Sequence, residues 1–428
     1  MTEHQTNQCS SSNRWYGEEW KRTKPDLVVY LPRTRDGNDN GNEHFLVFPS
    51  PGGDLLAMWT QSSHEGADDQ RVVLSRSKDD GVSWTAPEVI AGKEGPNDTM
   101  ASWGFPVVSA TGRIYCFYNK RSVVEDVHHQ ITGTLNCRYS DDDGHTWHGE
   151  TVLAMPRRKT DHPDPSIPAN WIVWQKPGKD PRGRWLVGFT RWTSKAVRWT
   201  PPNVRWPDWD SRIELMRFDN IDEEPLPEHL QISWFPEDGE ALCVPHPRYR
   251  QISVAQEPSI VNLPDGRLFM TVRTFTGHIW YSISEDGEKW NEPAVLRYRD
   301  GGEAIQQPLC CCPIYAFEEG RYILLYHNND GHFQDYGPYD TKYNRRPAFI
   351  ALGEYRSQAQ QPIWFSRPKL FCDSDGVPLG PLKRTEVATY TSFTERKGKR
   401  VLWYPDRKFF LLGRYITDEW LEGLKVPT

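Results

Sequence analysis

The sequence lacks any run of about 18 apolar residues, so it contains no candidate membrane-spanning helix. Its N-terminal residues contain no apolar segment of the kind found in secretion signals, which predicts a cytoplasmic protein. Basic residues are not in excess either, because the net charge is −7. This charge gives no reason to expect nucleic acid or an anionic membrane as a partner.

The eight cysteines show no paired spacing that would indicate a disulfide framework or a metal site. Three of them are consecutive, over residues 310–312, but neighbouring residues of a strand point to opposite faces. We therefore expect free thiols in a reducing compartment, with no bound metal and no cofactor.

Aromatic residues, proline and glycine are abundant by contrast. The chain of 428 residues contains 19 Trp, 18 Tyr, 17 Phe, 34 Pro and 32 Gly. Aromatic residues favour strands, whereas proline and glycine favour turns. The composition therefore predicts an all-β protein with many connections.

A short apolar strand that opens with glycine recurs six times. The copies begin at Gly53, Gly112, Gly183, Gly266, Gly320 and Gly398. Another apolar strand precedes each copy, so each unit begins with a β-hairpin. Six units of about four strands predict a six-bladed β-propeller of four-stranded antiparallel blades. We expect one propeller domain over residues 25–428 after an N-terminal tail over residues 1–24, closed by pairing of residues 26–32 with the C-terminal strands.

An acidic turn that ends in tryptophan follows the hairpin in three units. It reads SKDDGVSW over residues 77–84, SDDDGHTW over 140–147 and, in shortened form, SEDGEKW over 284–290. In such a turn an aspartate accepts backbone hydrogen bonds, a glycine adopts positive φ and a tryptophan packs between strands. We interpret Asp79, Asp142 and Asp286 as structural. A calcium loop is the alternative, but the later bidentate glutamate is missing.

This pattern resembles the sialidase superfamily, whose members carry Asp boxes of the form Ser-x-Asp-x-Gly-x-x-Trp. Two of the turns match that form fully, and the hairpin repeats extend the resemblance over nearly the whole chain. The resemblance implies Asp boxes at the blade edges and an active site elsewhere. It also implies a tyrosine nucleophile, a glutamate as its base, an aspartate as acid/base, and three arginines that bind a sugar carboxylate.

The repeat also predicts which residues face the centre of the propeller. Nine residues before the glycines lie His44, Trp103, Glu257, Cys311 and Thr389, and seven residues after them lie Thr60, Asn119, Thr190, Arg273, His327 and Pro405. We expect these strand ends to form the rim of one central funnel. Ordinary polar strand ends are the alternative, but Glu257 and Arg273 fall at opposite ends of one hairpin, which favours a site.

Three segments resemble catalytic segments of the superfamily. EPSIVNLPDGRLFMTVRT, over residues 257–274, implies that Glu257 is the base and Arg273 a carboxylate-binding residue. YNRRPAFIALGEYR, over residues 343–356, implies the same binding role for Arg345 or Arg346. ATYTSFTE, over residues 388–395, places the nucleophile at Tyr390.

The acid/base is expected in the acidic loop that precedes the first Asp box. This loop offers Glu65, Asp68 and Asp69, and Asp68 is the preferred residue. A solvated acidic loop is the alternative for the remaining carboxylates.

One position departs from the superfamily's pattern. The first arginine belongs in an Arg-Ile-Pro motif at the start of the first blade, but Glu43 and His44 stand there. Glu43 would repel a ligand carboxylate, and His44 is an alternative donor or a proton-transfer group near neutral pH. The departure leaves open an enzyme for another acidic or deoxy sugar, or a polysaccharide lyase.

Further polar residues are expected in rim loops, where propellers place specificity. His128 and His129 precede the second Asp box, and His327 begins a loop above the fifth blade. Together with Trp103 they predict a polar, aromatic pocket for a carbohydrate. The Trp-rich segment 191–212 is expected to be an insertion that either shields the site or forms an oligomer contact.

The sequence thus predicts an exo-acting, retaining, sialidase-like glycoside hydrolase that removes a terminal acidic sugar. Two alternatives remain open. One is a hydrolase or lyase for a non-sialic saccharide that uses a rim histidine. The other is a propeller that binds glycans or a protein partner without turnover.

Overall fold

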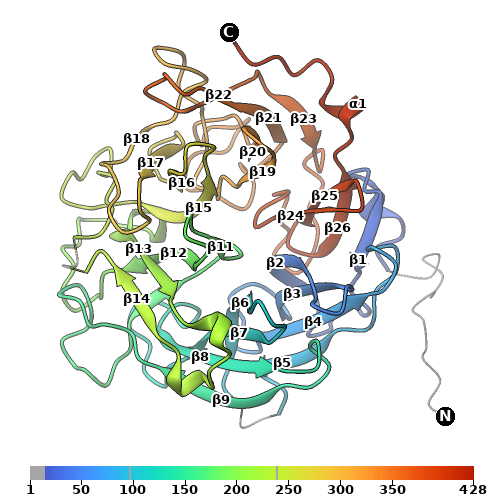
Figure 1. Cartoon of the computed structure of the whole chain (residues 1–428), viewed down its shortest axis with the longest axis vertical. Helices are drawn as coiled ribbons and strands as arrows, with labels where there is room; N and C mark the ends of the chain where they lie inside the picture. The colour runs from blue at the N-terminus through green and yellow to red at the C-terminus, as the bar shows by residue number, and fades with distance from the viewer. Residues whose placement is uncertain (1–14, 96–97, 238–239) are drawn as a thin grey trace.

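The computed structural model describes residues 15–95, 98–237 and 240–428. Six antiparallel sheets are arranged around a common axis (Figure 1), which confirms the predicted six-bladed propeller. Within those residues, no helix is long and apolar enough to cross a membrane. No group of three or more histidine, cysteine, aspartate or glutamate side chains in the same ranges is placed to hold a metal ion.

The first three blades follow one another along the chain. The first contains β2 (Gly41–Pro49), β3 (Leu55–Ser62), β4 (Arg71–Ser77) and β5 (Glu88–Gly92). The second contains β6 (Ala101–Val108), β7 (Ile114–Arg121), β8 (Gly133–Ser140) and β9 (His148–Leu153). The third contains β10 (Asn170–Ile172), β12 (Trp185–Trp192), β13 (Ser211–Phe218) and β14 (Ile232–Phe235), with β11 (Gly178–Lys179) paired to β12.

The remaining blades complete the ring. The fourth contains β15 (Gln256–Asn262), β16 (Leu268–Arg273), β17 (Trp280–Ser284) and β18 (Ala294–Val295). The fifth contains β19 (Ile314–Glu318), β20 (Arg321–Tyr326), β21 (Ala348–Tyr355) and β22 (Ile363–Phe365), with β23 (Lys369–Cys372) paired to β21. The sixth contains β24 (Ser392–Arg396), β25 (Lys399–Asp406), β26 (Phe410–Tyr415) and β1 (Leu27–Tyr30). The short helices are η2 (Glu19–Lys21), η3 (Trp206–Asp208), η4 (Ile221–Glu223), η5 (Pro227–His229) and α1 (Asp418–Leu421).

The sixth blade joins the two ends of the chain. β1 pairs with β26 in antiparallel register, with Leu27 opposite Gly413, and Figure 1 shows the blue strand beside the red ones. The predicted closure is therefore confirmed. The described part of the expected tail also packs on the propeller, because the Tyr16 hydroxyl donates to the Pro32 carbonyl at 2.9 Å. Residues 1–14 lie outside the described residues.

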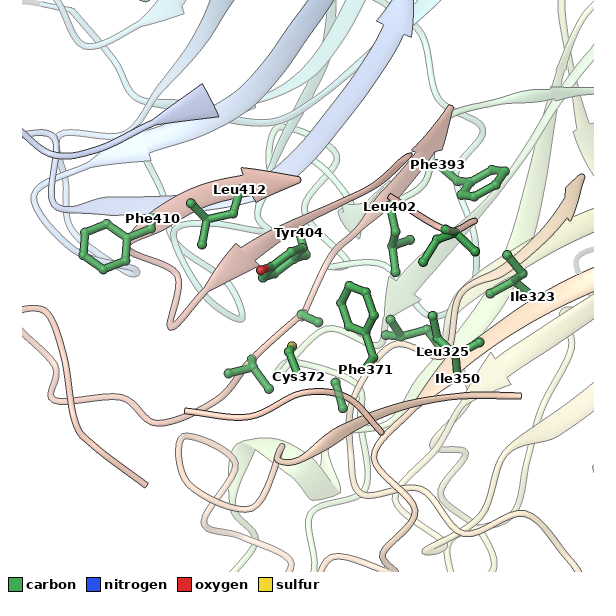
Figure 2. Close-up of a cluster of buried hydrophobic side chains, with 14 of the residues drawn as sticks. Ile323, Leu325, Ile350, Phe371, Cys372, Phe393, Leu402, Tyr404, Phe410 and Leu412 are labelled. Atoms are coloured by element: carbon green, nitrogen blue, oxygen red, sulfur yellow. The ribbon is translucent and has the colours of Figure 1, made fainter. Parts of the chain in front are cut away.

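Apolar layers between neighbouring blades form the core. Alternate residues of a strand point to opposite faces of the sheet, so each blade presents apolar side chains to both neighbours. Figure 2 shows such a layer, which joins Ile323, Leu325, Ile350, Phe371 and Cys372 of the fifth blade to Phe393, Leu402, Tyr404, Phe410 and Leu412 of the sixth. Because close-packed layers resist deformation, they fix the angle between blades and bring the inner strand ends together.

Hydrogen bonds at those inner ends connect the first four blades to one another. The Thr60 hydroxyl accepts from the Trp103 amide at 3.0 Å, and the Thr190 hydroxyl accepts from the Glu257 amide at 2.7 Å. The Asn119 side-chain amide donates to the Trp171 carbonyl at 2.9 Å. These three residues were expected at the funnel rim, and here they hold the backbone of the neighbouring blade.

The Asp boxes lie in the turns after the third strand of their blades. In the second box the Asp142 carboxylate accepts from the Thr146 amide at 2.8 Å and from the Ser140 hydroxyl at 2.8 Å. Gly144 has a φ of 86°, a conformation that other residues rarely adopt. Although burial opposes it, the hydrogen bonds from Thr146 and Ser140 lower the pKa of Asp142 to about 2. The structural interpretation of this box is therefore confirmed.

Asp142→Asn is expected to lower the free energy of unfolding at pH 7 by about 1–2 kcal/mol, because it removes charge-assisted hydrogen bonds inside the turn. Asp141→Asn, at the neighbouring position, is the matched control. Asp141 makes only a half-exposed ion pair with Arg113, so its substitution should cost less than about 0.5 kcal/mol. Denaturant unfolding of both variants makes the comparison. Equal losses would contradict a structural role for the box.

Candidate functional site

β-Bulges at the axis turn selected side chains into the centre of the propeller. The strand register shifts within β2, β6 and β15. At these shifts His44, Trp103 and Glu257 have positive φ values of 55°, 56° and 45°. Tyr390, which precedes β24, has a φ of 67°. Positive φ is strained for such residues, and it is typically retained at functional sites.

Tyr390, Glu257 and Arg273 come together at this centre. The Tyr390 hydroxyl donates to Glu257 Oε1 at 2.9 Å, and Arg273 Nη1 lies 3.4 Å from the same hydroxyl oxygen. Arg273 also forms an ion pair with Glu257. All three side chains are at least 96% buried. Burial, together with the charge of Glu257, raises the pKa of Tyr390 well above its usual range, so the phenol requires a base before it can act as a nucleophile.

Two further arginines lie beside this cluster, joined by a carboxylate. Glu386 Oε2 accepts from Arg345 Nη1 at 3.0 Å, and its other oxygen accepts from Arg384. Although burial opposes it, Arg384 and the nearby cations lower the pKa of Glu386 to about 2. Arg384 was not expected from the sequence, because it precedes the inner strand of the sixth blade and lies outside the hairpin repeat.

Glu43, Glu65 and Lys408 form a second carboxylate cluster next to Tyr390. Lys408 Nζ lies 3.2 Å from Glu43 Oε2, 2.5 Å from Glu65 Oε1 and 4.8 Å from the centre of the Tyr390 ring. Glu65 also pairs with Arg384. Lys408 was likewise missed in the sequence, because it belongs to the turn between β25 and β26.

That turn is strained and held by buried ion pairs. Arg407 and Lys408 both have positive φ, at 55° and 50°. The Phe409 amide closes the turn on the Asp406 carbonyl at 3.0 Å, and the Arg407 guanidinium pairs with Asp406 and Glu19. Two successive non-glycine residues in this conformation cost about 1–2 kcal/mol each. The strained turn places the buried ammonium group of Lys408 against the Tyr390 ring.

Tyr390, Glu257 and the three arginines border a cavity of about 390 Å³. Four tryptophans line it: Trp103, Trp192, Trp206 and Trp209. Residues 64–66 and Lys342 also line the cavity. The Trp-rich segment 191–212 thus contributes to the cavity wall, which is one of the two roles expected for it. The volume is within the range of small-molecule sites.

The model of the BNR repeat-like domain family matches residues 53–375, well over half of the chain. The protein belongs to this family. Among curated proteins, no significant match to the sequence is found.

Several solved structures share this fold at low sequence identity. The intramolecular trans-sialidase of Ruminococcus gnavus is 13% identical with a TM-score of 0.59, over 94% of this chain and 99% of that one. The NanB sialidase of Streptococcus pneumoniae is 11% identical with a TM-score of 0.57, over 91% and 70% of the two chains. A Dyadobacter fermentans protein of unknown function is 15% identical with a TM-score of 0.56, over 90% and 94%. The expected sialidase-like propeller is confirmed by these matches.

Only some of the residues expected at the site line this cavity. Trp103 lines it and packs edge-to-face on Tyr390, with ring centres 5.4 Å apart. Arg345 lines it, whereas Arg346 turns away and pairs with Asp373 at 2.8 Å. The choice left open between the two arginines is thus resolved by their side-chain directions: only Arg345 is placed to meet a ligand.

Asp68 does not reach the cavity. Its side chain is 76% exposed and pairs with Arg121 at 2.7 Å, on the outer side of the 63–69 loop. The structure therefore places the preferred residue, Asp68, away from the cavity, and Glu65 is the loop carboxylate that borders it. Asp68 turns outward to Arg121, whereas Glu65 turns inward to Arg384 and Lys408. Sequence spacing does not reveal these ion pairs.

Three expected histidine roles also need correction. His44 is fully buried beneath Trp103, and burial lowers its pKa to about 3, so it does not exchange protons near neutral pH. His129 lies behind the loop, where its Nε2 is 2.8 Å from the Gly66 carbonyl oxygen. His327 is buried with Nδ1 3.1 Å from the Pro347 carbonyl oxygen. None of the three borders the cavity.

Glu43 does not act as the repelling charge that the sequence indicated. Burial, followed by the nearby charge of Glu65, raises the pKa of Glu43 to about 8. The carboxyl group is therefore largely protonated at neutral pH. Without Glu43, the paired groups around the cavity comprise four basic side chains, Arg273, Arg345, Arg384 and Lys408, and three carboxylic side chains, Glu65, Glu257 and Glu386, so basic groups exceed acidic ones by one.

Glu43→Gln is expected to change how stability depends on pH. The folded-state pKa of Glu43 lies above its unfolded value of about 4.3. Its contribution to stability is therefore fully present below about pH 4 and lost as the pH rises through about 8. Glutamine cannot ionise and does not share this loss. The stability of the variant relative to wild type should therefore increase as the pH rises from 5 to about 9. Denaturant unfolding across this range measures it, and a constant difference would exclude a raised pKa.

Proposed function

We propose that the protein is an exo-acting glycoside hydrolase that removes a terminal anionic sugar from a glycan with retention of configuration. Tyr390 attacks the anomeric carbon while Glu257 accepts the phenolic proton. The hydrogen bond of 2.9 Å between these two groups, at the cavity wall, is the observation that carries the proposal.

The charges around the cavity support an anionic sugar. Arg273, Arg345 and Arg384 border the same space, and a guanidinium fork suits a carboxylate in two-point geometry. Arg384 thus offers a third guanidinium although the first blade has Glu43 where the superfamily has an arginine. The net positive charge that remains when Glu43 is protonated favours one ligand carboxylate.

The neighbouring structures support the same reaction class. Two of the matched propellers are named a sialidase and a trans-sialidase, and a tyrosine nucleophile is an established exception among glycosidases. Sialosides are therefore the first substrates to test, followed by glycans that end in a uronate.

The test is incubation of wild-type protein with a panel of sialylated and uronate-terminated oligosaccharides, read by mass spectrometry and proton NMR. Release of one terminal acidic monosaccharide, first seen in the anomeric form it had in the glycan, is expected. An unsaturated product absorbing in the near-ultraviolet would identify a lyase. Binding of panel members without any product would identify a non-catalytic glycan-binding propeller. Either result would refute the proposal.

A further inference from the structure

A glycosidase of the proposed kind needs a proton donor for the leaving-group oxygen. The loop between β3 and β4 faces the cavity and contains four titratable side chains: His64, Glu65, Asp68 and Asp69. The contacts of each side chain decide which one is available. This question rests on the proposed function.

The three carboxylates of the loop are committed to other partners. Glu65 has one oxygen on Lys408 and the other on Arg384, and these cations outweigh burial and hold its pKa well below the usual range. Asp68 lies outside the cavity on Arg121. Asp69 accepts from the Ser63 amide at 3.0 Å and does not border the cavity. An ionised, doubly paired carboxylate is a poor proton donor.

His64 is oriented by a short chain of hydrogen bonds. The Ser63 hydroxyl donates to Asp69 Oδ1 at 3.2 Å, and its oxygen lies 3.2 Å from His64 Nδ1. Because the Ser63 hydroxyl donates its proton to the hydrogen bond with Asp69, the Ser63 oxygen can accept from Nδ1–H of His64. The other ring nitrogen, Nε2, is left for a ligand. A histidine whose second nitrogen is held in this way has a fixed tautomer and ring orientation.

The backbone around His64 is also fixed. Its carbonyl accepts from the Ser62 hydroxyl at 2.9 Å and from the Ala67 amide at 3.0 Å. Gly41 packs directly beneath it, since a Cβ at Gly41 would lie 2.8 Å from His64 Cα. His129 supports the loop from behind at the Gly66 carbonyl. The imidazole therefore belongs to a rigid part of the cavity wall.

We propose that His64, and not a loop carboxylate, is the general acid and base of the reaction. In the first step Tyr390 Oη bonds to the anomeric carbon, Glu257 takes the phenolic proton, and the leaving-group oxygen takes a proton from the His64 imidazolium. In the second step neutral His64 takes a proton from the attacking water. The water oxygen bonds to the anomeric carbon as the bond from that carbon to Tyr390 Oη breaks, and Glu257 returns the phenolic proton to Tyr390.

The other histidine that borders the cavity is less suited to this role. Burial and the neighbouring His129 lower the pKa of His128 to about 4, and its Nδ1 accepts from the Gln130 amide at 3.2 Å. His128 is therefore neutral at neutral pH, with its protonated nitrogen at Nε2. It lacks the carboxylate-linked chain that His64 has.

The test compares two sialosides that differ in their need for a proton. The 4-methylumbelliferone group of an aryl sialoside leaves without much assistance, whereas the lactose of 3′-sialyllactose must be protonated to leave. His64→Gln should lower kcat/KM for sialyllactose by about 10²- to 10⁴-fold and for the aryl sialoside by less than about 10-fold. Added azide should restore turnover of the aryl sialoside, because it attacks the glycosyl-enzyme without a base. Asp68→Asn is the control and should leave both substrates unchanged.

Two results would overturn the inference. An equal loss for both substrates in His64→Gln, without azide rescue, would show that His64 only positions the wall. The leaving-group signature in Glu65→Gln instead would assign the proton to Glu65. In both cases cleavage that depends on Tyr390 would leave the proposed function intact, whereas wild-type protein that cleaves neither sialoside, nor any other acidic glycan, would refute that function itself.

Discussion

Tyr390→Phe is expected to abolish turnover of the acidic glycan, with kcat lower by about 10³-fold or more, while the released sugar still binds within a few-fold of wild type. The substitution removes one oxygen, the atom that contacts Glu257 and Arg273. The ring remains and keeps its contacts with Trp103 and Lys408. The cavity should therefore retain its shape, and only the chemical step should be lost. Steady-state kinetics and calorimetry with the released sugar separate the two effects.

The matched control for this experiment is Tyr298→Phe. Tyr298 is also a buried tyrosine with a hydroxyl hydrogen bond, to Tyr326 at 2.9 Å, but it lies in the apolar layer between the fourth and fifth blades. This variant should lose some stability and keep its kcat. If Tyr390→Phe retained more than about a tenth of wild-type kcat, a nucleophilic tyrosine would be ruled out, because no other group in the proposed mechanism forms the covalent bond.

Part of the site followed from the sequence because propeller geometry repeats. Glycines at the hairpin turns set a common count, and the same count identifies the bulge positions of His44, Trp103 and Glu257. Arg273 ends the same hairpin as Glu257, so a local pattern placed both residues at the axis. Closure by β1 also followed, because a ring of blades needs its last strand from one end of the chain.

The rest of the site depends on contacts that no local pattern contains. Arg384 and Lys408 lie in connections of the sixth blade, and their side chains reach the axis through ion pairs with residues more than 300 positions away. Their meeting with Glu65 is decided by the packing of the first blade against the sixth. Burial and the nearby charge of Glu65 keep Glu43 protonated. The sequence alone therefore predicted a negative charge at Glu43 that the folded protein does not have at neutral pH.

Lys408→Met should have the largest effect on stability among single changes at the site. The ammonium lies between Glu43 and Glu65, and all three side chains are largely withdrawn from water. Removing one partner of a buried ion pair typically costs about 3–5 kcal/mol, and without Lys408 the ionised Glu65 keeps only Arg384 as its cation. The change also removes the net positive charge around the cavity, so KM for an anionic sugar should rise. Denaturant unfolding and steady-state kinetics measure the two effects.

Lys397 offers a matched control at the opposite end of the same strand, β25. It too has positive φ, at 50°, and pairs with a carboxylate, Asp80 at 2.8 Å, but its side chain is 65% exposed. Lys397→Met should therefore cost less than about 1 kcal/mol, although the two lysines have the same φ. Equal losses for the two lysines would mean that the loss reports the turn and not the buried charge.

A second substitution separates uncompensated charge from lost packing. If Lys408→Met is destabilising because the ionised Glu65 loses a cation, then Glu65→Gln in the same chain should recover part of the loss, since it removes the charge that Lys408 had paired. Lys408→Arg, which keeps the charge, should remain closer to wild type than Lys408→Met. A double variant no more stable than Lys408→Met would show that Glu65 is not coupled to the lysine.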